Sequence, residues 1–422
     1  MRRFTIMKPV IHALMAVSVL TPAGGGTQMI ANGINEFGLE LHQRLAPADT
    51  GNVVTSPWSI SSAMAMTYAG AAGKTRDEIA ATMRFGDDGE AAHAGIAAIA
   101  ADLVKLAAES RARVEDPDRQ GGPNTPLQII TANRLFGQAG QEFEKPFTTL
   151  LEQTYAAPME LVDFINETEA ARIRINDWVA RQTIDRIKDL IPPGQLNEET
   201  RLVLANAIYL KATWAEAFSE VPGQPFRIAG AADATMVPGL SHQGYYGYLE
   251  SAGRIMISVP YEGGGLQFLI ILPKSPDGLR ELEKSLDAGV LADATRLPRH
   301  ELRLSMPKFK IEPERVMLAE QLQRMGITAA FDKPRGSADF SRMAPRKPND
   351  YLYISEVIHK AFIEVNKDGT EAAAATAVIM MRATAMPAEP PREVRVDRPF
   401  FFAVQHIASG TCLFMGRVTD PR

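Results

Sequence analysis

The sequence has little cysteine and no large excess of either charge. Its 422 residues include one cysteine, Cys412, so an intramolecular disulfide cannot form and a structural zinc site cannot be built from thiolates. Lys plus Arg total 45 and Asp plus Glu total 50, a formal net charge of -5, which provides no overall positive field to hold nucleic acid. Because 45% of the residues are hydrophobic, a large packed core can carry the fold.

Signatures of catalysis are also missing. The chain contains no G-x-S-x-G sequence, so a nucleophile elbow of that type is not indicated. It contains no H-E-x-x-H sequence, and none of its seven histidines pairs with another at metal-ligand spacing. The sequence therefore offers no support for a hydrolase of that type or for a histidine-based metal site, and no cofactor is expected.

The N-terminal segment 1–28 has the order of a secretory signal peptide. Basic residues come first, an apolar run follows at 10–20, and a short stretch with proline and three glycines ends the segment. The run is too short to span a bilayer, which takes about 20 apolar residues, and no later segment is expected to span one. We therefore expect export, to the extracellular space or to a bacterial periplasm, and a folded domain over 29–422. The alternative interpretation of 1–28 is an N-terminal extension.

Apolar periodicity predicts helices and strands mixed within one domain. Helices are expected at 34–45, at 59–70 and at 175–190, with another opened by a capping box at Thr75 and Glu78. The charged, Gly- and Pro-rich stretch 110–126 is expected to be a loop. The expected strands cover 202–210, 266–272, 302–306, 394–404 and 412–418. No βαβ regularity and no internal repeat occur, which favours an α+β fold in one large domain.

The most informative segment is rich in small residues and precedes a proline-rich stretch. Composition alone predicts a helix over 370–381, since alanine is the best helix former. A period-two interpretation instead treats it as an extended chain that could enter a sheet without a clash. One face would then carry only small or uncharged side chains, those of Thr370, Ala372, Ala374, Thr376 and Val378.

Several motifs in the chain resemble those of the serpin family. The residues 369–377 read GTEAAAATA and are similar to the hinge of inhibitory serpins, and 394–402 read VRVDRPFFF and are similar to the C-terminal signature of the family. Further similar stretches lie at 52–62, 175–194, 202–214, 306–308, 326–328 and 354–369. The resemblance extends over about 31–421, nearly the whole chain.

The resemblance implies a fold and a mechanism. It implies one domain with three β-sheets, eight or nine helices and an exposed reactive loop at about 367–393. It also implies suicide inhibition of a serine protease, in which the cleaved loop inserts into the main sheet and carries the acyl-enzyme to the opposite pole. The expected partner is thus a protease, with no nucleic acid or membrane partner, and the expected state is a monomer.

The resemblance also assigns roles to individual residues. Ser56, Ser59, Asn206 and His359 match a polar cluster beneath the sheet that opens, and Trp214 matches a tryptophan where insertion begins. Each of these also has a simpler interpretation, as a hydrogen-bonded or aromatic core residue. Lys308 matches a lysine that usually pairs with a glutamate two residues before the hinge glycine. The implied hinge residues are Gly369, Thr370, Glu371, Ala372, Ala373, Ala374, Ala375 and Thr376.

Two features leave alternatives open. The usual family spacing places the reactive bond at Ala383–Thr384, which suggests elastase-like or subtilisin-like proteases. A shift of one residue gives Arg382–Ala383 and trypsin-like proteases. In addition, Lys367 stands where the glutamate partner of Lys308 is usual, and two cations cannot form that bridge, although Asp368 or Glu364 could compensate. The alternative function is therefore a non-inhibitory binding or chaperone protein with the same fold.

Overall fold

A long buried strand lies at the centre of the computed structural model. The structure describes residues 24–46, 51–119, 122, 124–312, 315–348, 351–371 and 390–422. The apolar run expected at 202–210 forms β4 (Leu202–Thr213), which is buried along nearly its whole length. A strand that is buried on both faces consists of a near-continuous apolar run, and β4 follows that rule.

The first sheet is built around β4. On one edge β4 pairs antiparallel with β2 (Gln128–Gln138), beyond which lies β3 (Glu160–Val162). On its other edge β4 pairs first with β12 (Glu356–Ala361) in parallel, and then with β14 (Gly369–Thr370). The remaining strands of this eight-stranded sheet are β10 (Phe309–Ile311), β13 (Ile363–Val365) and β11 (Val316–Met317).

The second sheet has nine strands, and one long strand runs through it. β6 (Thr235–Glu250) pairs with β5 and β9 in its first part and with β7 at its end. Gly247 of β6 faces Arg299 on one side and Ser258 on the other. The described residues therefore form two hydrogen-bonded sheets where three were expected, because β6 pairs with β5 and β9 and also with β7. Its other members are β1 (Val53–Thr55), β5 (Ser219–Phe226), β7 (Arg254–Pro260), β8 (Leu266–Pro273), β9 (Arg299–Pro307), β15 (Arg392–Arg395), β16 (Phe400–His406) and β17 (Cys412–Val418).

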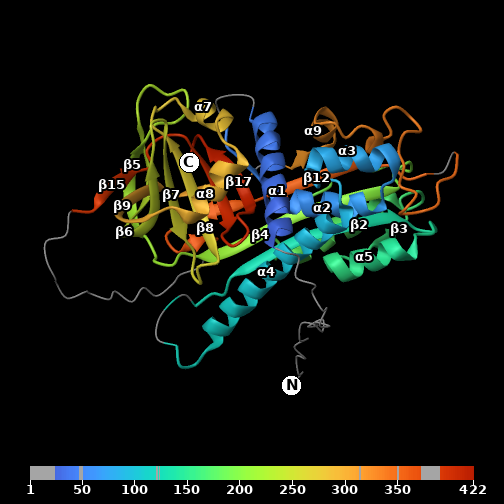
Figure 1. The fold of residues 1–422 in the computed structure, drawn as a ribbon, viewed down its shortest axis with the longest axis horizontal. Coiled ribbons are helices and arrows are strands. Elements are labelled where there is room, and N and C mark those ends of the chain that lie inside the picture. The colour runs from blue at the N-terminus through green and yellow to red at the C-terminus, as the bar shows by residue number, and fades with distance from the viewer. Residues whose placement is uncertain are drawn as a thin grey trace, which may run out of the picture.

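Nine α-helices occur among the described residues, in agreement with the expected eight or nine. In Figure 1, α1 stands between the strands of the second sheet and the pair α2 and α3. α2 is buried on nearly all sides and contacts α1, β2, β4 and β17. The helices are α1 (Gly24–Leu45), α2 (Pro57–Gly70), α3 (Gly73–Met83), α4 (Gly89–Glu115), α5 (Lys145–Tyr155), α6 (Thr168–Gln182), α7 (Leu279–Lys284), α8 (Ala288–Asp293) and α9 (Ala319–Arg324). The expected α+β class is confirmed.

Some helix boundaries differ from the expected ones. α1 begins at Gly24, so the last five residues of the segment 1–28 are helical, and Gln28 donates hydrogen bonds to Asn32 and to the carbonyl of Ser409. Tertiary packing here overrides the poor helix propensity of the glycines. The folded domain thus begins before residue 29, and 1–23 lie outside the described residues. α4 continues to Glu115, so the loop expected at 110–126 starts later.

Two further helix predictions were wrong. The expected helix 175–190 ends at Gln182, because the Asn176 side chain, which bonds the backbone of Ile191 through both its oxygen and its nitrogen, holds the following segment in an irregular conformation. The capping box at Thr75 does not form. Glu78 instead accepts the backbone N–H groups of Thr328 and Ala329, a tertiary contact that replaces the local one.

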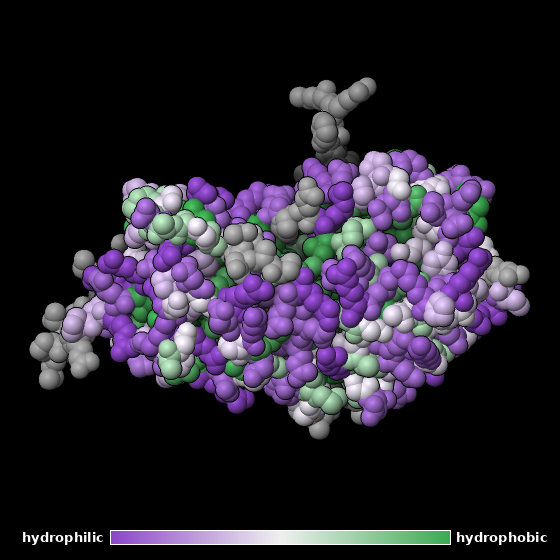
Figure 2. All heavy atoms as spheres, turned by 90° about the horizontal axis from the view of Figure 1, so that it is seen from above, coloured by the Kyte–Doolittle hydropathy of each residue, from purple (hydrophilic) through white to green (hydrophobic). Residues whose placement is uncertain are grey.

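α4 is long and apolar enough, by length and composition, to cross a membrane, contrary to the expectation for segments after residue 28. Its buried side chains Ile96, Ile99 and Leu103 belong to the main core, and the helix contacts α1, β2 and α5. One face of α4 therefore packs on the core, and its other residues are partly or fully exposed. On the face shown in Figure 2, hydrophilic side chains predominate and hydrophobic ones lie in small separate areas.

Candidate functional site

Strand register brings three polar side chains into one row across the first sheet. Asn133 of β2 lies opposite Asn206 of β4, and Asn206 lies opposite His359 of β12. Residues directly opposite one another in adjacent strands present their side chains on the same face of the sheet. The N-terminal end of α2 covers this row, so Ser56 and Ser59 complete a buried polar cluster.

Hydrogen bonds connect every member of this polar cluster. Asn206 Nδ2 donates to the carbonyl and to Oγ of Ser59, both at 2.7 Å, and lies 2.6 Å from Asn133 Oδ1. His359 Nε2 accepts the backbone N–H of Ser56 at 3.1 Å, so the proton is on Nδ1, which donates to Asn206 Oδ1. Ser56 Oγ also caps α2 by accepting the N–H of Ser59. Burial lowers the pKa of His359 to about 3, which agrees with a neutral ring.

Four of the five members were anticipated from the sequence, and Asn133 was missed. Asparagine is depleted in strands, so an asparagine two residues after the β-branched run 129–131 was the available signal.

This cluster spans what we call the lower junction. We define the lower junction as the parallel pairing of Val203–Ile208 in β4 with Glu356–Ala361 in β12, six residue pairs long. The His359–Asn206 hydrogen bond crosses it directly. A strand entering between β4 and β12 would have to break that bond and the whole ladder.

A different arrangement occupies what we call the upper junction, where β14 lies between β13 and β4. Gly369 and Thr370 pair antiparallel with Thr213 and Ala212 of β4, and Thr370 also pairs with Val365 of β13. The first two hinge residues are therefore already a strand of the sheet. Thr370 is 1% exposed and its hydroxyl contacts that of Tyr261.

These contacts correct the expected boundaries of the exposed loop. The loop was expected over 367–393, but β14 occupies Gly369–Thr370 and β15 begins at Arg392. The cause is the space between the ends of β4 and β13, which the hinge backbone fills with ladder hydrogen bonds. The remaining implied hinge residues and both candidate reactive bonds lie outside the described residues, at 372–376 and 382–384.

A tight turn connects β13 to β14 and is anchored by Trp214. Asn366 Oδ1 accepts the backbone N–H groups of Asp368 and Gly369. The indole Nε1 of Trp214 donates to the Asn366 carbonyl and its backbone N–H donates to the Asp368 carbonyl, both at 2.9 Å. The Trp214 ring stacks on Tyr261 with centroids 4.6 Å apart. Trp214 thus belongs to the upper junction and not to the polar cluster.

Gly369 is the residue that this close approach requires. Its φ is +155°, and a Cβ at this position would lie 2.0 Å from the carbonyl oxygen of Ala212. That contact is far inside van der Waals distance, so any side chain would push the hinge away from β4.

Lys308 also lies outside the cluster. Its Nζ is 3.0 Å from Glu220, whereas Lys367 Nζ is 2.9 Å from Asp368 Oδ1. Because 367 is not a glutamate, the two lysines take separate carboxylate partners. Asp368, one of the two compensating residues considered from the sequence, pairs with Lys367, whereas Glu220, which was not considered, pairs with Lys308.

Glu371 ends the docked hinge and meets a residue that the sequence did not single out. Its backbone N–H donates to the Glu364 carbonyl at 2.8 Å, and its carboxylate forms an ion pair with Arg186, in the segment after α6. The Glu371 residue is 8% exposed, and this burial raises its pKa to about 7. Arg186 lies in the irregular segment after Gln182, where the spacing of residues does not indicate which side chains lie together.

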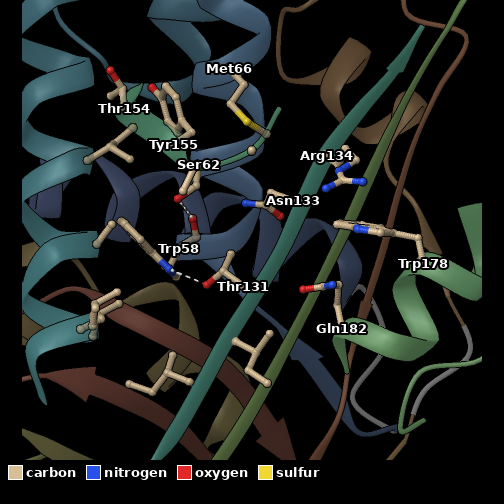
Figure 3. Close-up of a pocket in the computed structure, with 18 residues that line it drawn as sticks. Trp58, Ser62, Met66, Thr131, Asn133, Arg134, Thr154, Tyr155, Trp178 and Gln182 are labelled. Carbon is tan, nitrogen blue, oxygen red and sulfur yellow. Dashed lines mark hydrogen bonds between the residues drawn. The ribbon is translucent and has the colours of Figure 1, made fainter. Parts of the chain in front are cut away.

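A cavity of about 340 Å³ lies beside β2, with walls from α2, α4, α5 and α6 (Figure 3). Figure 3 shows Asn133 at this wall and the hydrogen bond from Trp58 Nε1 to Thr131 Oγ1, which is 3.2 Å long. The strand that carries one end of the polar cluster is therefore not backed by close packing along its whole length.

The described residues show neither a metal site nor a reactive thiol. No group of three or more His, Cys, Asp or Glu side chains among them could hold a metal ion. Cys412 is fully buried, and burial raises the pKa of its thiol to about 12. A buried neutral thiol has the packing role of a small apolar residue.

Comparison with known proteins identifies the family. The family model described as Serpin (serine protease inhibitor) matches residues 32–421. A leukocyte elastase inhibitor of Equus caballus is 33% identical over 405 residues, which are 93% of this chain and 100% of that protein. Among solved structures, uncleaved ovalbumin is similar with a TM-score of 0.77 at 25% identity, covering 93% of this chain and 100% of that chain. A serpin of the insect Tenebrio molitor has a TM-score of 0.75 at 28% identity, covering 94% of this chain and 99% of that chain.

The fold, with its two strand junctions, and the matching family model indicate the same class of protein. The chain belongs to the serpin family, and it is a protease inhibitor rather than an enzyme.

Proposed function

We propose that this protein inhibits serine endopeptidases by inserting its cleaved reactive loop between β4 and β12. The observation that carries the proposal is β14, which already lies antiparallel to both β4 and β13 at the upper junction. A chain continuing from Thr370 in that direction would enter the lower junction next. The first residues of the inserted strand would then be in place before any protease arrives.

The strand pairing supplies a driving force for this insertion. At present β4 and β12 pair in parallel over six residue pairs. An inserted strand would replace that ladder with two antiparallel ones, and antiparallel pairing is slightly more stable per residue. The backbone groups of the loop would also gain partners in the sheet. The intact chain is then the less stable arrangement, held by the polar cluster until the loop is cut.

The proposed reaction has one covalent stage and one conformational step. The protease serine attacks the carbonyl of the reactive bond, forms an acyl ester with the preceding residue, and releases the following residue as an amine. The ester-linked chain then inserts. The 14 residues from Thr370 to Ala383 would span about 46 Å when extended, at about 3.3 Å each. Insertion of a strand of this length would carry the attached protease across the molecule before water hydrolyses the ester.

The partner follows from the residue before the reactive bond. With the bond at Ala383–Thr384, the target is an elastase-like or subtilisin-like protease, and the name of the leukocyte elastase inhibitors agrees with the first. With the bond at Arg382–Ala383, the target is trypsin-like. Rates of inhibition of elastase and trypsin by the wild type, Ala383→Arg and Arg382→Ala decide between them. Export by the segment 1–28, and a monomeric state, remain predictions of the sequence.

The direct test is a covalent complex. Incubation with an elastase should give a band stable in SDS at the summed mass, and mass spectrometry should locate the ester at Ala383. Nicking the loop with a non-target protease should raise the melting temperature of the chain. Cleavage without a stable complex, together with an unchanged melting temperature, would refute inhibition by insertion and support a non-inhibitory binding or chaperone protein.

A further inference from the structure

The hinge stops at Glu371, and its side chain lies in a crowded, charged environment. Thr370 is buried between β4 and β13, whereas the next residue contacts the segment that follows α6. Glu371 is 8% exposed, and Arg186 forms an ion pair with its carboxylate. A buried carboxylate is costly unless a counter-charge accompanies it.

The backbone of Glu371 also departs from a strand. Its φ is +48°, in the left-handed region that non-glycine residues rarely adopt. Its N–H nevertheless donates to Glu364, so the conformation is held from both the backbone and the side chain. Further entry of the loop would require Glu371 to become extended and to leave its present position.

The charges around Glu371 come from three elements. Glu364 of β13 repels its carboxylate, whereas Lys211 of β4 and Arg186 attract it. Tyr209 of β4 lies close to Glu371 and to Arg186. Arg186 in turn faces an ion pair between Lys310 and Glu312. Among the described residues, Arg186 is the one of these groups that forms an ion pair with the Glu371 carboxylate.

We propose that Arg186 is a positioning residue that sets how deeply the hinge enters the sheet, through its ion pair with Glu371. With Arg186 present, the Glu371 carboxylate tolerates its buried position and Thr370 stays between β13 and β4. Without Arg186, the uncompensated carboxylate beside Glu364 favours withdrawal of the hinge. The inference concerns regulation of the insertion site, and its role in inhibition rests on the proposed function.

The proposal makes hinge docking dependent on pH. Burial raises the pKa of Glu371 from 4.5 to about 7 in the docked hinge. A raised carboxyl pKa means that docking is fully favoured below about pH 4.5 and loses strength as the pH rises to about 7. The ratio of docked to withdrawn hinge should fall at least tenfold between pH 5 and pH 8. Removing Arg186 should deepen that fall.

Trp214 provides the readout, because it contacts the hinge turn. Its indole donates to Asn366 and its ring stacks on Tyr261, whose hydroxyl contacts Thr370. Tryptophan emission of the full chain would be measured from pH 5 to pH 8. Deuterium exchange of peptides covering 363–371, corrected for the chemical exchange rate, would locate the change at the hinge.

Four variants separate the contributions. Arg186→Gln should match the wild type at pH 5 and show at least tenfold more withdrawn hinge at pH 8. Arg186→Lys keeps the charge and should restore most of the docking. Glu371→Gln should remain docked with less than a twofold change across this pH range, and adding Arg186→Gln to it should change nothing. Lys188→Gln, which removes an exposed cation from the same segment, should behave as the wild type.

Either of two results would overturn the proposal. One is an Arg186→Gln chain whose emission and exchange equal those of the wild type at pH 8. The other is a pH dependence that persists in Glu371→Gln. No protease is needed for these measurements. A chain that shows the expected pattern but traps no protease would refute the proposed function and leave this inference standing.

Discussion

The upper and lower junctions join the same strand, β4, to the same neighbouring segment, yet they are closed in different ways. The lower junction closes by parallel pairing of β4 with β12 and by a polar cluster beneath it. The upper junction is closed by a third strand, β14, which is antiparallel to both neighbours. The two residues of β14 at the upper junction therefore have the pairing that an inserted loop would have along the whole lower junction.

The two junctions also respond to acid in opposite directions. At the upper junction the raised pKa of Glu371 means that protonation favours the docked hinge. At the lower junction the pKa of His359 is depressed to about 3, because burial disfavours the charged form of the ring. Acid therefore favours docking of the hinge at the upper junction, and it weakens the polar cluster that closes the lower junction.

The largest expected effect comes from a charge at the upper junction. Thr370→Arg would bury a guanidinium at a position that is 1% exposed, at a cost of several kcal/mol. The hinge should then stay out of the sheet, the acyl-enzyme should hydrolyse, and the variant should become a substrate. The measurement is the stoichiometry of inhibition, together with melting temperatures before and after nicking.

Thr370→Ser is the matched control, since it keeps the hydroxyl that contacts Tyr261. It should inhibit with nearly the wild-type stoichiometry. An arginine variant that traps protease as efficiently as this control would show that Thr370 does not enter the sheet during inhibition.

A smaller effect is expected from cutting the cluster at the lower junction. His359→Leu has similar volume but removes the hydrogen bonds to Ser56 and Asn206, which should lower the free energy of unfolding of the intact chain by about 1–3 kcal/mol. In a chain with an inserted loop the His359–Asn206 bond is already broken, so the nicked form should lose less. Urea unfolding of both forms measures the difference.

Lys360→Leu, on the same strand but only partly buried, serves as the control for the lower junction. It should change both forms equally and by less than about 1 kcal/mol. Equal losses in the intact and nicked forms of His359→Leu would show that the cluster does not act as a closure.

The pH dependence of stability tests the sign at the lower junction. Because the folded pKa of His359 is depressed, its contribution is present above about pH 6.5 and is lost as the pH falls toward 3. The wild type should lose roughly 1–2 kcal/mol from this residue between pH 7 and pH 5. His359→Leu should lack that part of the slope in urea titrations at the two pH values. An identical slope in both proteins would contradict the neutral, buried ring.

The smallest effect is expected behind the lower junction, at the cavity beside β2. Ala100→Leu would place a larger side chain from α4 into the space of about 340 Å³ and keep helix propensity high. The free energy of unfolding should rise by about 0.5–1 kcal/mol in a chemical denaturation experiment. Ala94→Leu, on an exposed position of the same helix, should give no gain beyond about 0.3 kcal/mol.

The sequence predicted the buried central strand and four members of the polar cluster. The apolar run at 202–210 predicted β4, and the family resemblance placed Ser56, Ser59, Asn206 and His359 together. Predictions failed where a tertiary partner replaced a local one. Glu78 bonds Thr328 and not its own helix end, and the hinge docks because β4 and β13 leave unpaired backbone groups beside it. Arg186 was missed because the apolar pattern predicted a helix over 175–190, whereas the segment after Gln182 that carries Arg186 is irregular.

The docked hinge has a kinetic consequence. Joining a free loop to a sheet normally begins with a search, in which the chain loses conformational entropy before it gains any contact. Here the turn at Asn366 and the two residues of β14 have completed that nucleation step. After cleavage, further pairing can proceed residue by residue from an existing end. The rate should therefore depend on how fast the β4–β12 ladder separates and hardly at all on the length of the loop.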